Sequence, residues 1–188
     1  YGVPLAADSR DVGLSRSTFT GASWNRSNLK QTTVYADLNH RFNADWKLKV
    51  SALQMNETSN STHQRVHGTV APDGSGMTYA DWITHFDSDK VGLDAFVNGS
   101  FNALGLRHEV TLGADYSKYQ SDDKYTRNFT SGGNLFDIDH NRPKPTEESL
   151  LAAGGRQSVS SYDVRQKGIY ASWRAQLTEP LTAIVGAR

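Results

Sequence analysis

Residues 32–52, TTVYADLNHRFNADWKLKVSA, decide the fold class. Apolar and polar side chains alternate up to Phe42, and the alternation resumes at Trp46 after the three residues Asn-Ala-Asp. A period of two is that of a β-strand, in which successive side chains point to opposite faces of the sheet. The stretch therefore predicts two antiparallel strands joined by a tight turn at residues 43–45.

Four more segments alternate in the same way. They lie at residues 91–98, 109–116, 169–177 and 181–188. Short turns are expected at residues 102–105 and 178–180, and the polar stretches 54–90 and 117–166 are expected to be long loops. Six alternating segments predict an all-β fold, an antiparallel up-and-down meander of about six strands.

Two features are expected inside the long loops. Residues 71–76, APDGSG, form a cluster of turn-forming residues and predict a hairpin tip. Residues 145–154 predict a short helix, because Thr146 suits the N-cap, two acids follow in the first turn, and Gly154 suits the end. The long loop from Asn128 to Gly155 should lie at the same end of the sheet as this tip.

Composition excludes several classes of site. The 188 residues include 20 Lys and Arg against 20 Asp and Glu, and this zero net charge gives no sign of nucleic-acid binding. The absence of cysteine excludes disulfides, thiolate metal sites and cysteine nucleophiles.

The chain opens on Tyr1 instead of methionine and stops at Arg188 within an apolar run, so we expect a piece of a longer protein.

The unequal connections favour an outer-membrane β-barrel, which has short periplasmic turns, long extracellular loops and membrane strands of about 9–11 residues. Phe42, Trp46 and Phe101 lie beside the short turns, where an interfacial aromatic belt is expected. A soluble β-sandwich shows the same alternation, so both folds remain open here. In a barrel, the lipid side would carry Leu38, Leu48, Val50, Leu93, Val110, Leu112, Ile169 and Trp173. The lumen side would carry Asp37, Lys49, Asp94, Glu109 and Arg174.

Metal-binding patterns are weak. His63 and His67 would lie on one face of an extended segment about 13 Å apart, too far to share an ion. The acids and amide from Asp137 to Glu148 have the spacing of a calcium loop, but Arg142 replaces the required glycine and no flanking helices are evident. We therefore interpret this segment as a solvated loop.

Trp24 and Trp82 are the candidate ligand-binding residues. Both lie in segments expected at the loop end of the sheet, where a flat side chain can pack against a ligand at little entropic cost. Tyr79 is three residues before Trp82, so the two should face opposite ways in a strand. The alternative is that both tryptophans brace neighbouring strands, and no catalytic residue is predicted.

Several segments together resemble the barrel of TonB-dependent ferric-siderophore receptors. They are LSRSTFTGASWN at 14–25, TTVYADLNHRF at 32–42, DWKLKVSA at 45–52, GLRHEVTLGADY at 105–116, KGIYA at 167–171 and EPLTAIVGAR at 179–188. The resemblance implies a 22-stranded barrel whose lumen holds a separate N-terminal plug domain. Residues 1–188 would then be a fragment of that barrel, without the plug, the signal peptide and the remaining strands.

The same resemblance implies the function. The expected protein binds a ferric siderophore, of hydroxamate or pyoverdine type, in the outer membrane of a Gram-negative bacterium and imports it with energy supplied by TonB. It is not an enzyme and needs no cofactor, because iron arrives already ligated by the siderophore. Its expected partners are the siderophore, the TonB complex through parts outside this chain, and outer-membrane lipid, but no nucleic acid. The alternatives are a passive or adhesive outer-membrane barrel and a soluble β-sandwich that binds carbohydrate.

Overall fold

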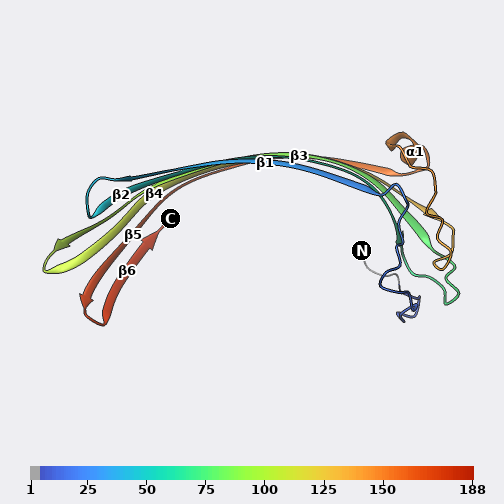
Figure 1. Cartoon of the computed structure of the whole chain (residues 1–188), viewed down its shortest axis with the longest axis horizontal. Helices are drawn as coiled ribbons and strands as arrows, with labels where there is room; N and C mark the ends of the chain where they lie inside the picture. Colours follow the sequence, from blue (N-terminus) through green and yellow to red (C-terminus); the bar gives the residue numbers. More distant parts are fainter. Residues whose placement is uncertain (1–4) are drawn as a thin grey trace. The chain divides into compact units, whose positions relative to one another are not determined.

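A computed structural model describes residues 5–188, and the first four residues of the predicted 1–188 barrel fragment lie outside it. Six strands form one sheet in chain order (Figure 1), which confirms the antiparallel up-and-down meander. The elements are β1 (Arg26–Arg41), β2 (Trp46–His67), β3 (Thr78–Ala103), β4 (Leu106–Ser131), α1 (Glu147–Ala152), β5 (Arg156–Thr178) and β6 (Leu181–Ala187).

The three short turns occur where the sequence predicts them. In the first turn, the side-chain oxygen of Asn43 accepts hydrogen bonds from the backbone N–H groups of Asp45 and Trp46, both at 2.9 Å. In the turn between β3 and β4, Leu104 and Gly105 have φ of 53° and 74°, the positive values that a two-residue hairpin turn requires. The third turn joins β5 to β6 at residues 179–180.

The predicted long loops, residues 54–90 and 117–166, are longer than the connections in the structure. β2 continues to His67 and β4 to Ser131, so the long connections are only residues 68–77 and 132–155. The strands continue because polar side chains pair across them. Asn60 and His85 are 2.7 Å apart, and Thr58 donates to Asp87 at 2.8 Å. Both faces are polar here, so the alternation that marks a strand in the sequence is lost although the backbone pairing persists.

The predicted helix forms in the second long connection. Thr146 is its N-cap and accepts from the N–H of Ser149, while the Ser149 hydroxyl lies 2.9 Å from the Thr146 N–H, which completes a capping box. Gly154, with φ of 84°, follows the last turn as predicted. No helix within residues 5–188 has the length and apolar composition needed to cross a membrane.

The chain divides into two compact units. Unit 1 comprises the described residues up to Lys30 with Thr58–Asp87 and Asp122–Ser161, and it contains both long connections. Its core consists of Val66, Val70, Met77, Tyr79 and Leu135. Unit 2 comprises Gln31–Glu57, Ser88–Ser121 and Tyr162–Arg188 and contains the three short turns.

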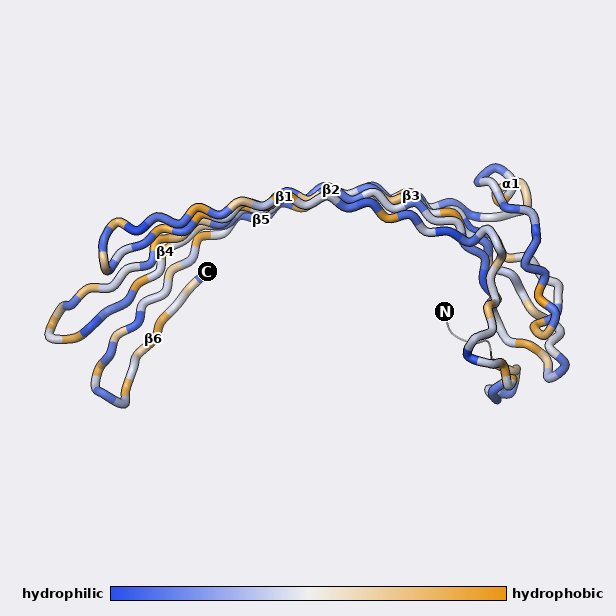
Figure 2. The backbone as a smooth tube through the Cα atoms, in the orientation of Figure 1, coloured by the Kyte–Doolittle hydropathy of each residue, from blue (hydrophilic) through white to orange (hydrophobic). Residues whose placement is uncertain are grey.

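Unit 2 exposes an apolar face. Along its strands the tube in Figure 2 alternates between hydrophobic and hydrophilic residues. The apolar members remain open to solvent, with exposed fractions of 60% for Leu38, 57% for Leu112 and 80% for Ile169. Near the short turns, three rings lie side by side. The His108 ring stacks on those of Phe101 and Trp173, at centroid distances of 5.1 and 5.7 Å. A soluble domain would bury such a face.

Candidate functional site

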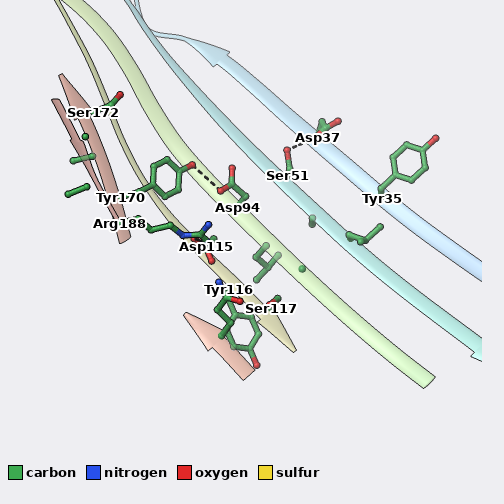
Figure 3. A pocket seen from close by; sticks show the side chains of 18 residues that line it. Tyr35, Asp37, Ser51, Asp94, Asp115, Tyr116, Ser117, Tyr170, Ser172 and Arg188 are labelled. Carbon is green, nitrogen blue, oxygen red and sulfur yellow. Dashed lines mark hydrogen bonds and ion pairs between the residues drawn. The ribbon is translucent and has the colours of Figure 1, made fainter. Parts of the chain in front are cut away.

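The opposite face of unit 2 is a polar wall, which we call the inner wall, formed by Asp37, Ser51, Asp94, Asp115, Tyr170 and Arg188 (Figure 3). The Ser51 hydroxyl donates to Asp37 at 2.5 Å, and the Tyr170 hydroxyl donates to Asp94 at 2.9 Å. Arg188 pairs with Asp115 at 2.9 Å. These residues border a hollow of about 890 Å³ on the face that the sequence assigns to the lumen.

Two glycines allow the wall to form. A Cβ atom on Gly113 would meet the ring of Tyr170, and one on Gly168 would lie 2.6 Å from a carboxylate oxygen of Asp115. The Tyr170 side chain therefore lies flat across β4 and reaches Asp94 on β3. Hydrogen bonds and ion pairs thus engage all three carboxylates of the inner wall, which offers a polar surface.

Unit 1 carries a second set of side chains, which we call the cation–aromatic row: Arg65, His67, Trp82, Tyr125, Arg127 and Phe129. The Arg65 guanidinium lies 4.0 Å from the centre of the Trp82 ring, and that ring lies 6.0 Å from Tyr125. Arg127 lies between Tyr125 and Phe129, at 5.8 and 5.6 Å from their ring centres. Cations over aromatic faces at these distances attract each other.

Trp24 has different partners. Its indole N–H donates to the carbonyl oxygen of Arg142 at 2.7 Å, and the Arg142 guanidinium stacks 4.0 Å above Tyr79. Arg142 also approaches Asp81 at 3.9 Å. Burial raises the pKa of the Asp81 carboxyl, and the charge of Arg142 opposes this rise. Trp24 thus anchors the loop of Arg142, which is a contact with a loop and not with a neighbouring strand.

The structure does not pair Trp24 with Trp82. Tyr79 is buried in the core and Trp82 contacts Arg65, so these two residues face opposite ways as predicted. The assignment of Trp24 and Trp82 as ligand contacts stays a prediction.

Metal ligands do not gather in the part of the chain that the structure describes. Among residues 5–188 no group of three His, Asp or Glu side chains could hold an ion. In the calcium-like segment, Asp139 accepts from the N–H of Asn141 at 2.9 Å, and Arg142 turns to Tyr79. The interpretation of the segment from Asp137 to Glu148 as a solvated loop stays a prediction.

Comparison with known proteins decides the family. The model described as "TonB dependent receptor-like, beta-barrel" matches residues 1–188. The chain belongs to this family. The family is one of receptors, and one of the solved structures described below is a receptor of the outer membrane of Pseudomonas aeruginosa.

Relatives of the chain are receptors for ferric pyoverdine. The ferric-pyoverdine M114 receptor PbuA of Pseudomonas sp. (strain M114) is 36% identical over the whole chain, and the ferric-pyoverdine 358 receptor of Pseudomonas putida is 28% identical. The chain spans 23% of each, so it corresponds to about a quarter of a receptor of this family.

Solved structures share the fold. The ferripyoverdine receptor of the Pseudomonas aeruginosa outer membrane bound to ferripyoverdine superposes with a TM-score of 0.79 at 23% identity, over 97% of this chain and 24% of that one. The FpvAI–pyocin S2 complex gives the same TM-score at 24% identity and the same coverage. These structures confirm a partial barrel fold for this member of the TonB-dependent receptor family.

Sequence reasoning missed the cations of the cation–aromatic row. Arg65 and Arg127 alternate with His67, Tyr125 and Phe129 along β2 and β4, and this alternation was the available signal. This alternation alone does not show which side chains meet, because the cross-strand register brings Arg65 over Trp82.

Proposed function

We propose that this chain is part of an outer-membrane receptor that binds a ferric siderophore of the pyoverdine type and imports it with energy supplied by TonB. Family membership and the pyoverdine receptors among its relatives support this function. The observation that carries it here is the cation–aromatic row of unit 1, the unit that also contains both long connections.

The row matches the chemistry of such a ligand. A ferric siderophore offers a flat chromophore and acidic oxygens around the metal, and Trp82 with Tyr125 offers flat surfaces while Arg65 and Arg127 offer positive charge. Iron arrives fully ligated, so the protein supplies no metal ligand, no cofactor and no catalytic group. Trp82 is the proposed ligand contact, and Trp24, which also holds the loop of Arg142, is its proposed partner in the ligand site.

The orientation in the membrane follows from the two units. The short turns of unit 2 face the periplasm, the long connections of unit 1 face the outside, and the exposed apolar face of unit 2 meets lipid. The full receptor has a 22-stranded barrel with a plug domain, and the plug, the TonB contact and the other strands lie outside this chain. The exposed apolar face of unit 2 disfavours a soluble β-sandwich, and the cation–aromatic row of unit 1 favours uptake of a ligand over a passive barrel.

Ferric-pyoverdine binding to the full receptor tests this proposal. Trp82→Ala should weaken binding about fivefold or more, because an aromatic pair contributes roughly 1 kcal/mol beyond its buried area. The matched control is Trp46→Ala, a tryptophan beside a periplasmic turn, which should bind as the wild type does. Unchanged affinity for Trp82→Ala in a normally inserted receptor would remove the row from the ligand site.

A further inference from the structure

Two arginines face each other in unit 1 where the long connection after β4 returns to the sheet. They are Arg127 on β4 and Arg156, the first residue of β5, and we call them the arginine pair. The Gln157 side chain donates to the Thr126 hydroxyl at 2.9 Å, so these two residues are cross-strand neighbours and Arg156 lies opposite Arg127. Both arginines border a cavity of about 250 Å³.

The turn before β5 holds the arginine pair together. A Cβ atom on Gly155 would lie 2.6 Å from the carbonyl oxygen of Arg127, so a side chain does not fit at this position. The Asn128 side chain donates to the carbonyl oxygen of Ala153 at 3.3 Å and ties the turn to β4. The backbone therefore fixes the place where Arg156 enters the sheet.

The charge of the arginine pair is not neutralised by the described residues. Within residues 5–188 neither arginine forms an ion pair, and both side chains are exposed. Among the strand residues of unit 1, Asp123 is the only acid on the same strand face, and it lies about 13 Å from Arg127 along β4. Like charges on directly opposite residues destabilise a sheet. A bound anion would remove this repulsion.

Guanidinium geometry identifies the class of anion. Each guanidinium presents a planar fork of N–H donors that matches the two oxygens of a carboxylate. Two such forks at one small cavity can hold one carboxylate from both sides. The neighbouring Gly155 leaves the space beside the forks free of a side chain.

The arginine pair is continuous with the cation–aromatic row. Arg127 belongs to both, because it also lies between the rings of Tyr125 and Phe129. The Tyr125 ring in turn lies 6.0 Å from that of Trp82. A ligand that stacks on Trp82 and Tyr125 would therefore bring its nearest substituent to the arginine pair.

We propose that Arg127 and Arg156 form a carboxylate subsite, which binds an acidic group of the siderophore that does not ligate iron. This inference rests on the proposed function, because it needs the ligand to occupy the cation–aromatic row. It adds a chemical preference to that function: the receptor selects siderophores with a free carboxylate over neutral ones. Arg156, which lies outside the row, determines this preference.

Binding of two matched ligands to the full receptor tests the inference. One is a ferric pyoverdine with a free carboxylate that is not an iron ligand, and the other is the same compound with that carboxylate converted to a primary amide. The wild type should bind the acid about tenfold more tightly than the amide, as expected for hydrogen bonds to a charged group. R156Q should bind the acid about tenfold more weakly and the amide as the wild type does.

The amide and a second variant are the controls. Unchanged binding of the amide to R156Q shows that the rest of the ligand site is intact. K144Q removes another exposed cation from the same long connection and should keep the preference of the wild type for the acid. A preference that persists in R156Q would overturn the carboxylate subsite, and so would an equal loss of preference in K144Q.

The same measurement separates this inference from the proposed function. Equal binding of the acid and the amide by the wild type would overturn the carboxylate subsite alone. Binding of neither compound would overturn the proposed function, and the subsite with it.

Discussion

Leu112→Arg should strongly destabilise the full receptor in a bilayer. Leu112 is 57% exposed on the outer face of β4 and lies six residues beyond Leu106, where the strand begins. The outward face of β4 from Leu106 to the aromatic Tyr116 spans 11 residues, which matches the roughly 9–11 residues of a membrane strand, so Leu112 lies one residue beyond its middle. An arginine on the lipid face near the midplane lowers the free energy of unfolding of the barrel by about 2–4 kcal/mol.

Thr111→Arg is the matched control on the inner face. The side chain of Thr111 accepts a hydrogen bond from Asn98 at 2.8 Å, and its loss should cost only about 0.5–1.5 kcal/mol because arginine finds a polar surface there. The assay is reversible unfolding of the full receptor in lipid vesicles by guanidinium chloride. Equal costs at the two positions would refute the assignment of the outer face to lipid.

Two further predictions concern the inner wall and the helix. Gly113→Ala should lower the free energy of unfolding by about 1–3 kcal/mol in the same titration, because the new Cβ atom would meet the ring of Tyr170. In a Tyr170→Ala background the same substitution should lower it far less. Equal costs in both backgrounds would contradict this packing. The ammonium of Lys124, aided by His85, holds the pKa of Glu147 below its usual 4.5, so this pair stabilises α1 above that pH and ceases to do so as the pH falls through the lowered value. Hydrogen exchange of the α1 amides, corrected for intrinsic rates, should accelerate on acidification in the wild type but not in Glu147→Gln, and identical pH profiles would argue against the contact.

The fold could be predicted wherever one strand face is apolar. The turn after Phe42 was predictable because the alternation stops and restarts around Asn43, whose side chain forms the turn. The upper part of β2 was missed because both of its faces are polar, and the upper part of β4 alternates only weakly, with Tyr125 and Phe129 among polar residues. There the strand is held by cross-strand pairs such as Thr58 with Asp87, and a linear pattern cannot show these pairs.

The candidate site was predicted only in part. Trp82 was selected as an aromatic residue near the loop end, and the structure adds Arg65 above it through pairing that depends on strand register. Trp24 contacts a carbonyl 118 positions away, and no local signal predicts such a contact.

Uptake of radioactive ferric pyoverdine by cells that carry the full receptor tests the central claim most directly. Cells with the receptor should accumulate iron, and accumulation should stop when TonB is deleted or a protonophore is added, while binding at the surface remains. Receptor-dependent accumulation that persists without TonB would indicate a passive barrel. The absence of both binding and uptake across a panel of ferric pyoverdines would contradict the assignment to siderophore transport.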